Sequence, residues 1–127
     1  MSLSLHPLLK QSRRADITFY RNGRIDVGTR IVRQLALYAG DTLGMAFDDD
    51  NNVLIYRHLS AHECHFARHE ATLFNQHVGQ CSLRCNSINM ARYVFQRYHA
   101  NHHVRCSMGE IVEDKTFGRC VNLVVII

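Results

Sequence analysis

The stretch ITFYRNGRIDVGTRIVRQLALYAGDTLGMAFDDDNNVLIYR, residues 17–57, decides the fold of this chain. It opens with β-branched and aromatic residues at 17–20, which predict a strand. Asn22-Gly23 is a strong signal for a tight hairpin turn, because both residues tolerate the positive φ angles that such a turn needs. Charged and apolar residues then alternate over 24–27, as in a half-buried strand. We therefore expect the stretch to begin with a β-hairpin.

A short helix and a second hairpin are expected to follow. Val27, Ile31 and Leu35 recur at every fourth position, which predicts a short amphipathic helix over residues 29–36. Polar turn residues then separate two further apolar segments. The predicted elements after the helix are a turn at Gly40-Asp41, a strand at 43–47, a turn at 48–52 and a strand at 53–57. The expected order is strand, strand, helix, strand, strand.

This ordered set of residues resembles the AbrB-like family of swapped-hairpin DNA-binding domains. The match runs without gaps from Gly23 to Asp41, and with the hairpin that follows it covers roughly a third of the chain. The matching segments are Asn22-Gly23-Arg24-Ile25, Ile31-Val32-Arg33-Gln34-Leu35-Ala36-Leu37, Gly40-Asp41 and Asn52-Val53-Leu54-Ile55-Tyr56-Arg57. The chain departs from the family at Val27 and Gly28, where members usually carry Ile-Pro, and at Asp26, a negative charge in the strand expected near DNA.

The resemblance implies that the hairpins of two copies interleave into one closed β-structure. Physical reasoning agrees, because a unit of about 40 residues rarely buries enough apolar surface alone. Such a unit also leaves strand edges open to pairing. Two arrangements supply the second copy: a homodimer, which we expect first, or an intrachain pseudo-dimer formed with the second half of the same chain.

The resemblance also implies a function, which is the binding of duplex DNA through an Arg-rich face. Arg24 matches the family's Gly-Arg position, and Arg33 matches the basic position just before the closing Leu of the helix. Four further candidate contacts are our extrapolation from the pattern: Arg21, Arg30, Arg13 and Arg14. The net charge of +4, with 13 of the 15 basic residues being Arg, fits a nucleic-acid partner. We therefore expect a bacterial-type transcription regulator or an antitoxin-like protein.

The predicted fold class is strand-rich α+β. The predicted organisation is a flexible tail at 1–15, an AbrB-like swapped-hairpin β-barrel unit at 16–58, and a smaller β-α-β-β unit at 59–127. In the last unit Asn86-Ser87 can cap an amphipathic helix over 88–99. Its other predicted elements are strands at 65–74, 103–108 and 118–126 and turns at 109–110 and 114–115. This unit is either a divergent repeat of the first or an unrelated one.

Histidine and cysteine gather in the second half, where eight of the nine His lie at or after residue 58. These side chains are the usual zinc ligands. The weak metal candidates are His62, Cys64, His65, His69, Cys81 and Cys85. Three residues separate Cys81 from Cys85, so this pair is not a tight Cys-x-x-Cys knuckle. We expect no metal, and we expect Cys81, Cys85, Cys106 and Cys120 to pack in a core. A zinc-binding structural protein stays an alternative.

The remaining sequence signals are negative. A Gly-rich phosphate loop, a nucleophile elbow and a paired-carboxylate motif are all missing, so we expect neither an enzyme nor a cofactor. The chain also lacks an apolar run of membrane-spanning length and a secretory signal, and its five Cys fit a reducing compartment. We therefore expect a cytoplasmic protein away from membranes. A protein-interaction module that dimerises without binding DNA is the second alternative.

Overall fold

The computed structural model describes residues 15–58, 70–75 and 81–126. The described residues form two helices, α2 (Thr29–Gln34) and α3 (Ile88–Tyr98). They form nine strands: β1 (Ile17–Tyr20), β2 (Arg24–Val27), β3 (Thr42–Phe47), β4 (Val53–His58), β5 (Glu70–Thr72), β6 (Phe74–Asn75), β7 (Leu83–Asn86), β8 (His103–Asp114) and β9 (Gly118–Val125). Neither of these two helices is long and apolar enough to cross a membrane.

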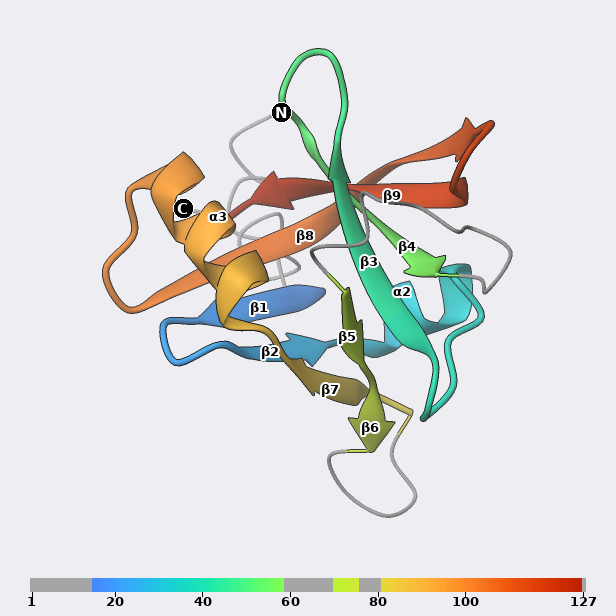
Figure 1. Ribbon diagram of the computed structural model, residues 1–127, viewed down its shortest axis with the longest axis horizontal. Helices are drawn as coiled ribbons and strands as arrows, with labels where there is room; N and C mark the ends of the chain where they lie inside the picture. Colours follow the sequence, from blue (N-terminus) through green and yellow to red (C-terminus); the bar gives the residue numbers. More distant parts are fainter. Residues whose placement is uncertain (1–14, 59–69, 76–80, 127) are drawn as a thin grey trace, which may run out of the picture.

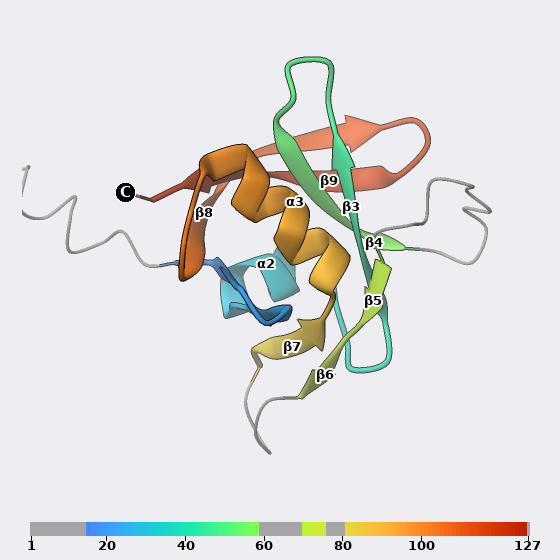
Figure 2. The same ribbon diagram turned by 60° about the vertical axis from the view of Figure 1, so that its left-hand side comes forward.

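All nine strands belong to one antiparallel sheet that curls into a nearly closed barrel (Figures 1 and 2). The order across the sheet is β5-β3-β4-β9-β8-β1-β2-β7-β6. Its two ends meet because only Leu73 separates β5 from β6. Leu73 also continues the pairing beside β3, since its N–H donates to Asp41 O and its carbonyl accepts from Gly40 N, each at 2.8 Å. The strand-rich fold expected from the sequence is confirmed at this level.

The inside of the barrel is a single main core. Inward residues alternate with outward ones along β1 and β2, so that Ile17, Phe19, Ile25 and Val27 are buried while their neighbours are partly exposed. α2 adds Ile31 and Val32 to this core, Leu35 follows directly after the helix, and α3 adds Met90 and Val94. In Figure 1 α3 lies at the left of the barrel and α2 at its right.

The pairing pattern of the barrel is unchanged when the two halves of the chain are exchanged. We match β1 with the β5–β6 stretch, β2 with β7, β3 with β8 and β4 with β9. The β1–β2 pair then maps onto β6–β7, β3–β4 onto β8–β9, and β1–β8 onto β5–β3. The β2–β7 and β4–β9 pairs map onto themselves. α2 and α3 also take matching places, since they follow β2 and β7.

The elements expected in residues 17–57 are confirmed, with α2 ending at Gln34, two residues earlier than predicted. The predicted helix beginning after Ser87 is also confirmed, and the Ser87 Oγ accepts the Met90 N–H at 3.1 Å. Residues 65–69 of one predicted strand lie outside the described residues. The strand β7 was not expected from the sequence.

The predicted turn at 109–110 is wrong, because β8 continues through it to Asp114 with a register shift between Met108 and Ile111. The reason lies in Gly109. A Cβ atom there would lie 2.9 Å from the Val124 side chain and 3.0 Å from the Asn122 carbonyl. This glycine therefore permits a close approach of β9 at an irregular point of the strand and does not form a turn.

The start of α2 explains why Gly stands where the AbrB-like pattern has Pro. The Gly28 N–H donates to the Asp16 carbonyl at 2.7 Å, and a Cβ at this position would lie 2.8 Å from the same oxygen. Proline would remove the donor. Asp16 is itself buried, and its Oδ2 accepts the Met108 N–H of β8 at 2.6 Å. One residue thus ties together β1, α2 and β8.

Candidate nucleic-acid interface

Polar and charged side chains form a row across five strands on the outside of the barrel. Thr18 of β1 stands opposite both Arg105 of β8 and Asp26 of β2. Arg84 of β7 stands opposite both Asp26 and Phe74 of β6. Directly opposite residues of antiparallel strands point to the same face of the sheet. The row therefore places two guanidinium groups, a carboxylate and an exposed aromatic ring on one continuous face.

A second row lies beside the first on the same face. Tyr20 stands opposite His103, with ring centroids 6.5 Å apart, and Arg24 stands opposite Asn86. The Arg24 guanidinium carbon lies 4.0 Å from the centroid of the Tyr20 ring. We call the outer surface formed by Arg24, Arg84, Arg105, His103 and Tyr20 the basic face.

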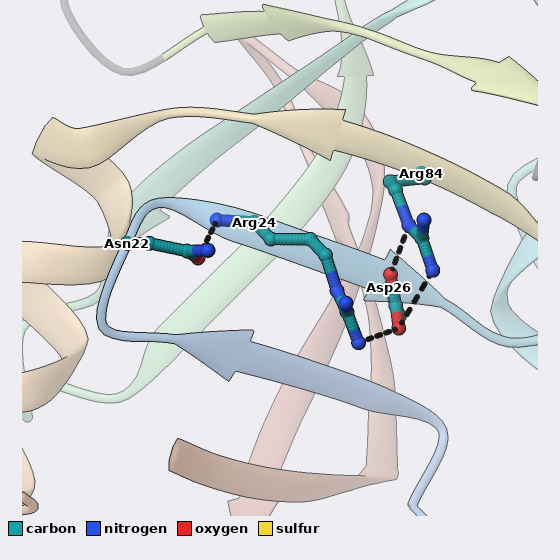
Figure 3. A network of polar contacts seen from close by, with 4 residues as sticks. All are labelled: Asn22, Arg24, Asp26 and Arg84. Carbon is teal, nitrogen blue, oxygen red and sulfur yellow. Dashed lines mark hydrogen bonds and ion pairs between the residues drawn. The ribbon is translucent and has the colours of Figure 1, made fainter. Parts of the chain in front are cut away.

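An ion-pair network fixes two arginines of the basic face (Figure 3). Arg84 Nε lies 2.6 Å from Asp26 Oδ1, and Arg24 Nη2 lies 3.2 Å from Asp26 Oδ2. The side chains of Arg24, Arg84 and Asp26 remain 38%, 28% and 22% exposed, so solvent still reaches all three. Two guanidinium groups share one carboxylate, and the network keeps a net positive charge.

The geometry further favours the charged form of Arg24. A side-chain hydrogen bond with Tyr20 is the main cause that raises the pKa of the Arg24 guanidinium above its ordinary value, and the nearby Asp26 charge raises it further. The Asn22 Oδ1 accepts the backbone N–H of Arg24 at 3.0 Å and closes the turn before it. The turn, the ring and the carboxylate together orient one guanidinium outward from β2.

Asp26, which departs from the AbrB-like pattern, has its charge countered by Arg84, a residue that the sequence reasoning missed. Arg105 was missed in the same way. Part of the signal for β7 is present in the sequence, because Leu83, Arg84 and Cys85 alternate as in a half-buried strand. Only the sheet pairing places this strand beside β2.

The other predicted DNA contacts lie apart from this network. Arg30 and Arg33 are exposed residues of α2, and Arg30 pairs with Asp16 at 3.3 Å. Arg21 is exposed and donates to the Asn101 carbonyl at 3.2 Å. Arg13 and Arg14 lie outside the described residues. Of the arginines predicted from the sequence, Arg24 is thus the one that the sheet brings together with Arg84.

A hollow of about 490 Å³ lies beside α3, next to the β1–β2 turn. Arg21 and Arg92 contribute guanidinium groups to its lining, and Gln96 and Asn101 contribute amides. Phe95 adds apolar surface. Two cationic groups over an apolar surface suit an anionic group, such as a phosphate, better than a cation.

Two of the predicted metal candidates, Cys81 and Cys85, lie among the described residues. Cys85 is fully buried in the core and Cys81 is exposed. His62, Cys64, His65 and His69 lie outside the described residues. Within 15–58, 70–75 and 81–126, no group of three or more His, Cys, Asp or Glu is arranged to hold a metal ion.

The expectation that the cysteines pack in a core is confirmed for Cys85, Cys106 and Cys120 and is wrong for Cys81. Burial raises the pKa of the Cys85 and Cys106 thiols to about 12 and that of Cys120 to about 11. These three thiols are therefore protonated at neutral pH, and a protonated thiol is neither a good nucleophile nor a metal ligand.

The fold and this surface define a strand-rich, nearly closed antiparallel barrel with a basic outer face. No family model, no curated protein and no solved structure matches the chain.

Proposed function

We propose that the protein binds duplex DNA through its basic face, as a cytoplasmic transcription regulator or antitoxin-like protein. One observation carries the proposal. Strands far apart in the sequence bring Arg24, Arg84 and Arg105 onto one continuous outer surface, and Asp26 accounts for a single negative charge among them. Guanidinium groups contact phosphates and also bridge the O6 and N7 atoms of guanine.

We further propose a relationship with AbrB-like swapped-hairpin domains. The order β1-β2-α2-β3-β4 and the insertion of these hairpins among strands of the second half support it. In this arrangement the second half of the chain supplies β7 and β9 as partners of β2 and β4, where the resemblance implies a second copy. The intrachain pseudo-dimer is therefore the form that we now favour.

Titration of the full chain against a fluorescent duplex at two salt concentrations tests the DNA proposal. The logarithm of the affinity should fall with the logarithm of the salt concentration, with a slope of about −0.9 for each phosphate contacted. The double variant Arg24→Gln and Arg84→Gln should weaken binding at low salt and flatten this slope. Arg119→Gln is the matched control, because Arg119 is exposed on β9 and bonds Glu113 and the Gln34 carbonyl. Absence of binding at low salt would overturn the proposal.

A protein-interaction module is the second candidate, and one observation favours it. Ile88 at the start of α3 is 61% exposed, and the exposed rings of Tyr93 and Phe47 lie 5.6 Å apart beside the same helix. A hollow of about 340 Å³ adjoins these two rings. If the duplex fails to bind while the chain co-purifies stoichiometrically with a protein that Tyr93→Ala releases, this candidate replaces the first.

A further inference from the structure

We infer that the protein recognises an asymmetric DNA site with one chain per site, because its barrel has two matching but chemically unlike halves. The inference rests on the proposed function and adds to it the class of target. Homodimeric DNA-binding proteins match their own twofold symmetry with palindromic sites. A single chain that only imitates this symmetry presents different side chains to the two sides of a duplex.

The strand topology has an approximate twofold symmetry. Exchange of the two halves leaves every strand pairing in place, and the approximate twofold axis passes between β2 and β7 and between β4 and β9. Both halves contribute to the same core, in which Ile17 and Phe19 lie together with Leu83 and Val104. The second half thus occupies the place of a second copy, and one chain closes the sheet.

The pairing of β2 with β7 brings unlike charges together at the axis. Buried Ile25 and Val27 of β2 match buried Leu83 and Cys85 of β7, so that Asp26 corresponds to Arg84. These two corresponding residues stand directly opposite each other, with Arg84 Nε 2.6 Å from Asp26 Oδ1. Two identical β2 strands in this register would oppose two Asp26 carboxylates, and like charges directly opposite are destabilising. The ion pair therefore favours the union of unlike halves.

The outward side chains next to this pair also differ between the two halves. The outward residue before Asp26 on β2 is Arg24, and the corresponding position before Arg84 is Ser82. A duplex across the axis would meet Arg24 on one side and Ser82 at the corresponding position on the other.

The other end of the axis has an apolar centre in place of the ion pair. There β4 pairs with β9, and the Tyr56 ring stacks on Phe117 at a centroid distance of 4.4 Å. Leu54, Tyr56 and Cys120 form a small buried cluster on this side. The charged end at β2 and β7 is therefore the one suited to a nucleic acid.

Selection of duplexes from a random pool with the full chain tests the inference. The expected result is an enriched motif without dyad symmetry, together with a complex mass of one chain per duplex. A palindromic motif bound by two chains would overturn the inference, as would tight binding without any enriched motif. Both results leave the proposed DNA binding intact. Absence of binding to any duplex at low salt overturns the inference and the proposed function together.

Footprinting of both DNA strands of the selected motif is the second test. Arg24→Gln should reduce protection on one side of the motif only, and Arg84→Gln should reduce it at a different position nearer the centre. A homodimer would lose protection at two symmetric places from either change. Arg119→Gln, on β9, should leave the footprint unchanged and serves as the control.

Discussion

At the residue scale, Asp26 shows how a carboxylate can belong to a surface with a net positive charge. Its two oxygens hold Arg24 and Arg84 at fixed places, with the shortest contact at 2.6 Å. Partly exposed pairs of this kind contribute little to stability. We therefore assign the network mainly to the placement of charge on the basic face.

Removal of this carboxylate should strengthen DNA binding. In Asp26→Asn the basic face gains one net positive charge, so we expect tighter binding at low salt and a salt slope steeper by up to about 0.9. Asp49→Asn, which removes one carboxylate from the distant β3–β4 turn, is the control for net charge alone. Weaker binding of Asp26→Asn would show that the orientation of the arginines matters more than their net charge.

Gly44 is required by the ring of Tyr56. A Cβ at residue 44 would lie 2.3 Å from the Tyr56 ring, so Gly44→Ala should destabilise the fold by roughly 1–3 kcal/mol through overpacking. Urea unfolding of Gly44→Ala, Tyr56→Ala and the double variant measures the coupling free energy between these two positions. Equal costs of Gly44→Ala with and without the Tyr56 ring would contradict this account.

The buried thiols should be unreactive in the folded state. Because burial raises the pKa of Cys85 and Cys106 to about 12, both stay protonated at pH 8, and iodoacetamide should modify exposed Cys81 far faster. Peptide mass analysis after a timed reaction measures each site. Similar rates at Cys81 and Cys85 would contradict the assigned burial.

Because of these buried thiols, we expect the free energy of unfolding to fall in alkali. Below pH 9.0, the ordinary pKa of a thiol, their contribution is complete, because the thiols are protonated both in the folded chain and in the unfolded chain. Between pH 9 and 12 only the unfolded chain ionises, which lowers the free energy of unfolding by roughly 1.4 kcal/mol per pH unit for each thiol. The loss should level off once the pH passes the folded pKa.

At the element scale, α2 depends on an anchor outside itself. Its N-cap residue, Gly28, makes no side-chain capping bond, and its N–H is used by the Asp16 carbonyl at 2.7 Å. α3 has a different start, since the Ser87 hydroxyl caps it directly. The short helix is thus held by β1, while the longer helix carries its own cap.

Introduction of the proline that is usual in the AbrB-like pattern should therefore harm this chain. Gly28→Pro removes the donor to Asp16 O, and we expect a cost of about 1–3 kcal/mol from the unsatisfied carbonyl. Thr29→Pro is the matched control, because the first helical position tolerates proline. Thermal unfolding of both variants compares them, and equal midpoints would contradict the anchoring role of Gly28.

At the scale of the whole molecule, the Asp26–Arg84 pair joins the two halves of the barrel. Asp26→Arg and Arg84→Asp should each oppose like charges and lower stability by roughly 1 kcal/mol. The two changes together should restore most of this loss, because they rebuild the pair in reverse. The thermal midpoints of the three variants measure both the loss and its recovery. A double variant no more stable than the single ones would argue against this contact as a link between the halves.

Much of residues 17–57 could be predicted because its signals are local. The Asn22-Gly23 turn and the alternation in β2 depend on neighbours along the chain. The residues that complete the basic face, Arg84 and Arg105, could not be predicted, because they reach Arg24 only through β7 and β8. The division at about residue 58 stays a prediction, while segments on both sides of it share one sheet and one core.

The sequence by itself determined the hairpins, the places of both helices and the excess of arginine, since turn geometry, side-chain period and charge are properties of short segments. Only the tertiary structure decided which strands became neighbours. Pairing between distant strands depends on the burial of one face of each and on the charges that meet on the other. Here that pairing placed Asp26 opposite Arg84, formed a nearly closed barrel within one chain and gathered arginines from separate strands on one face.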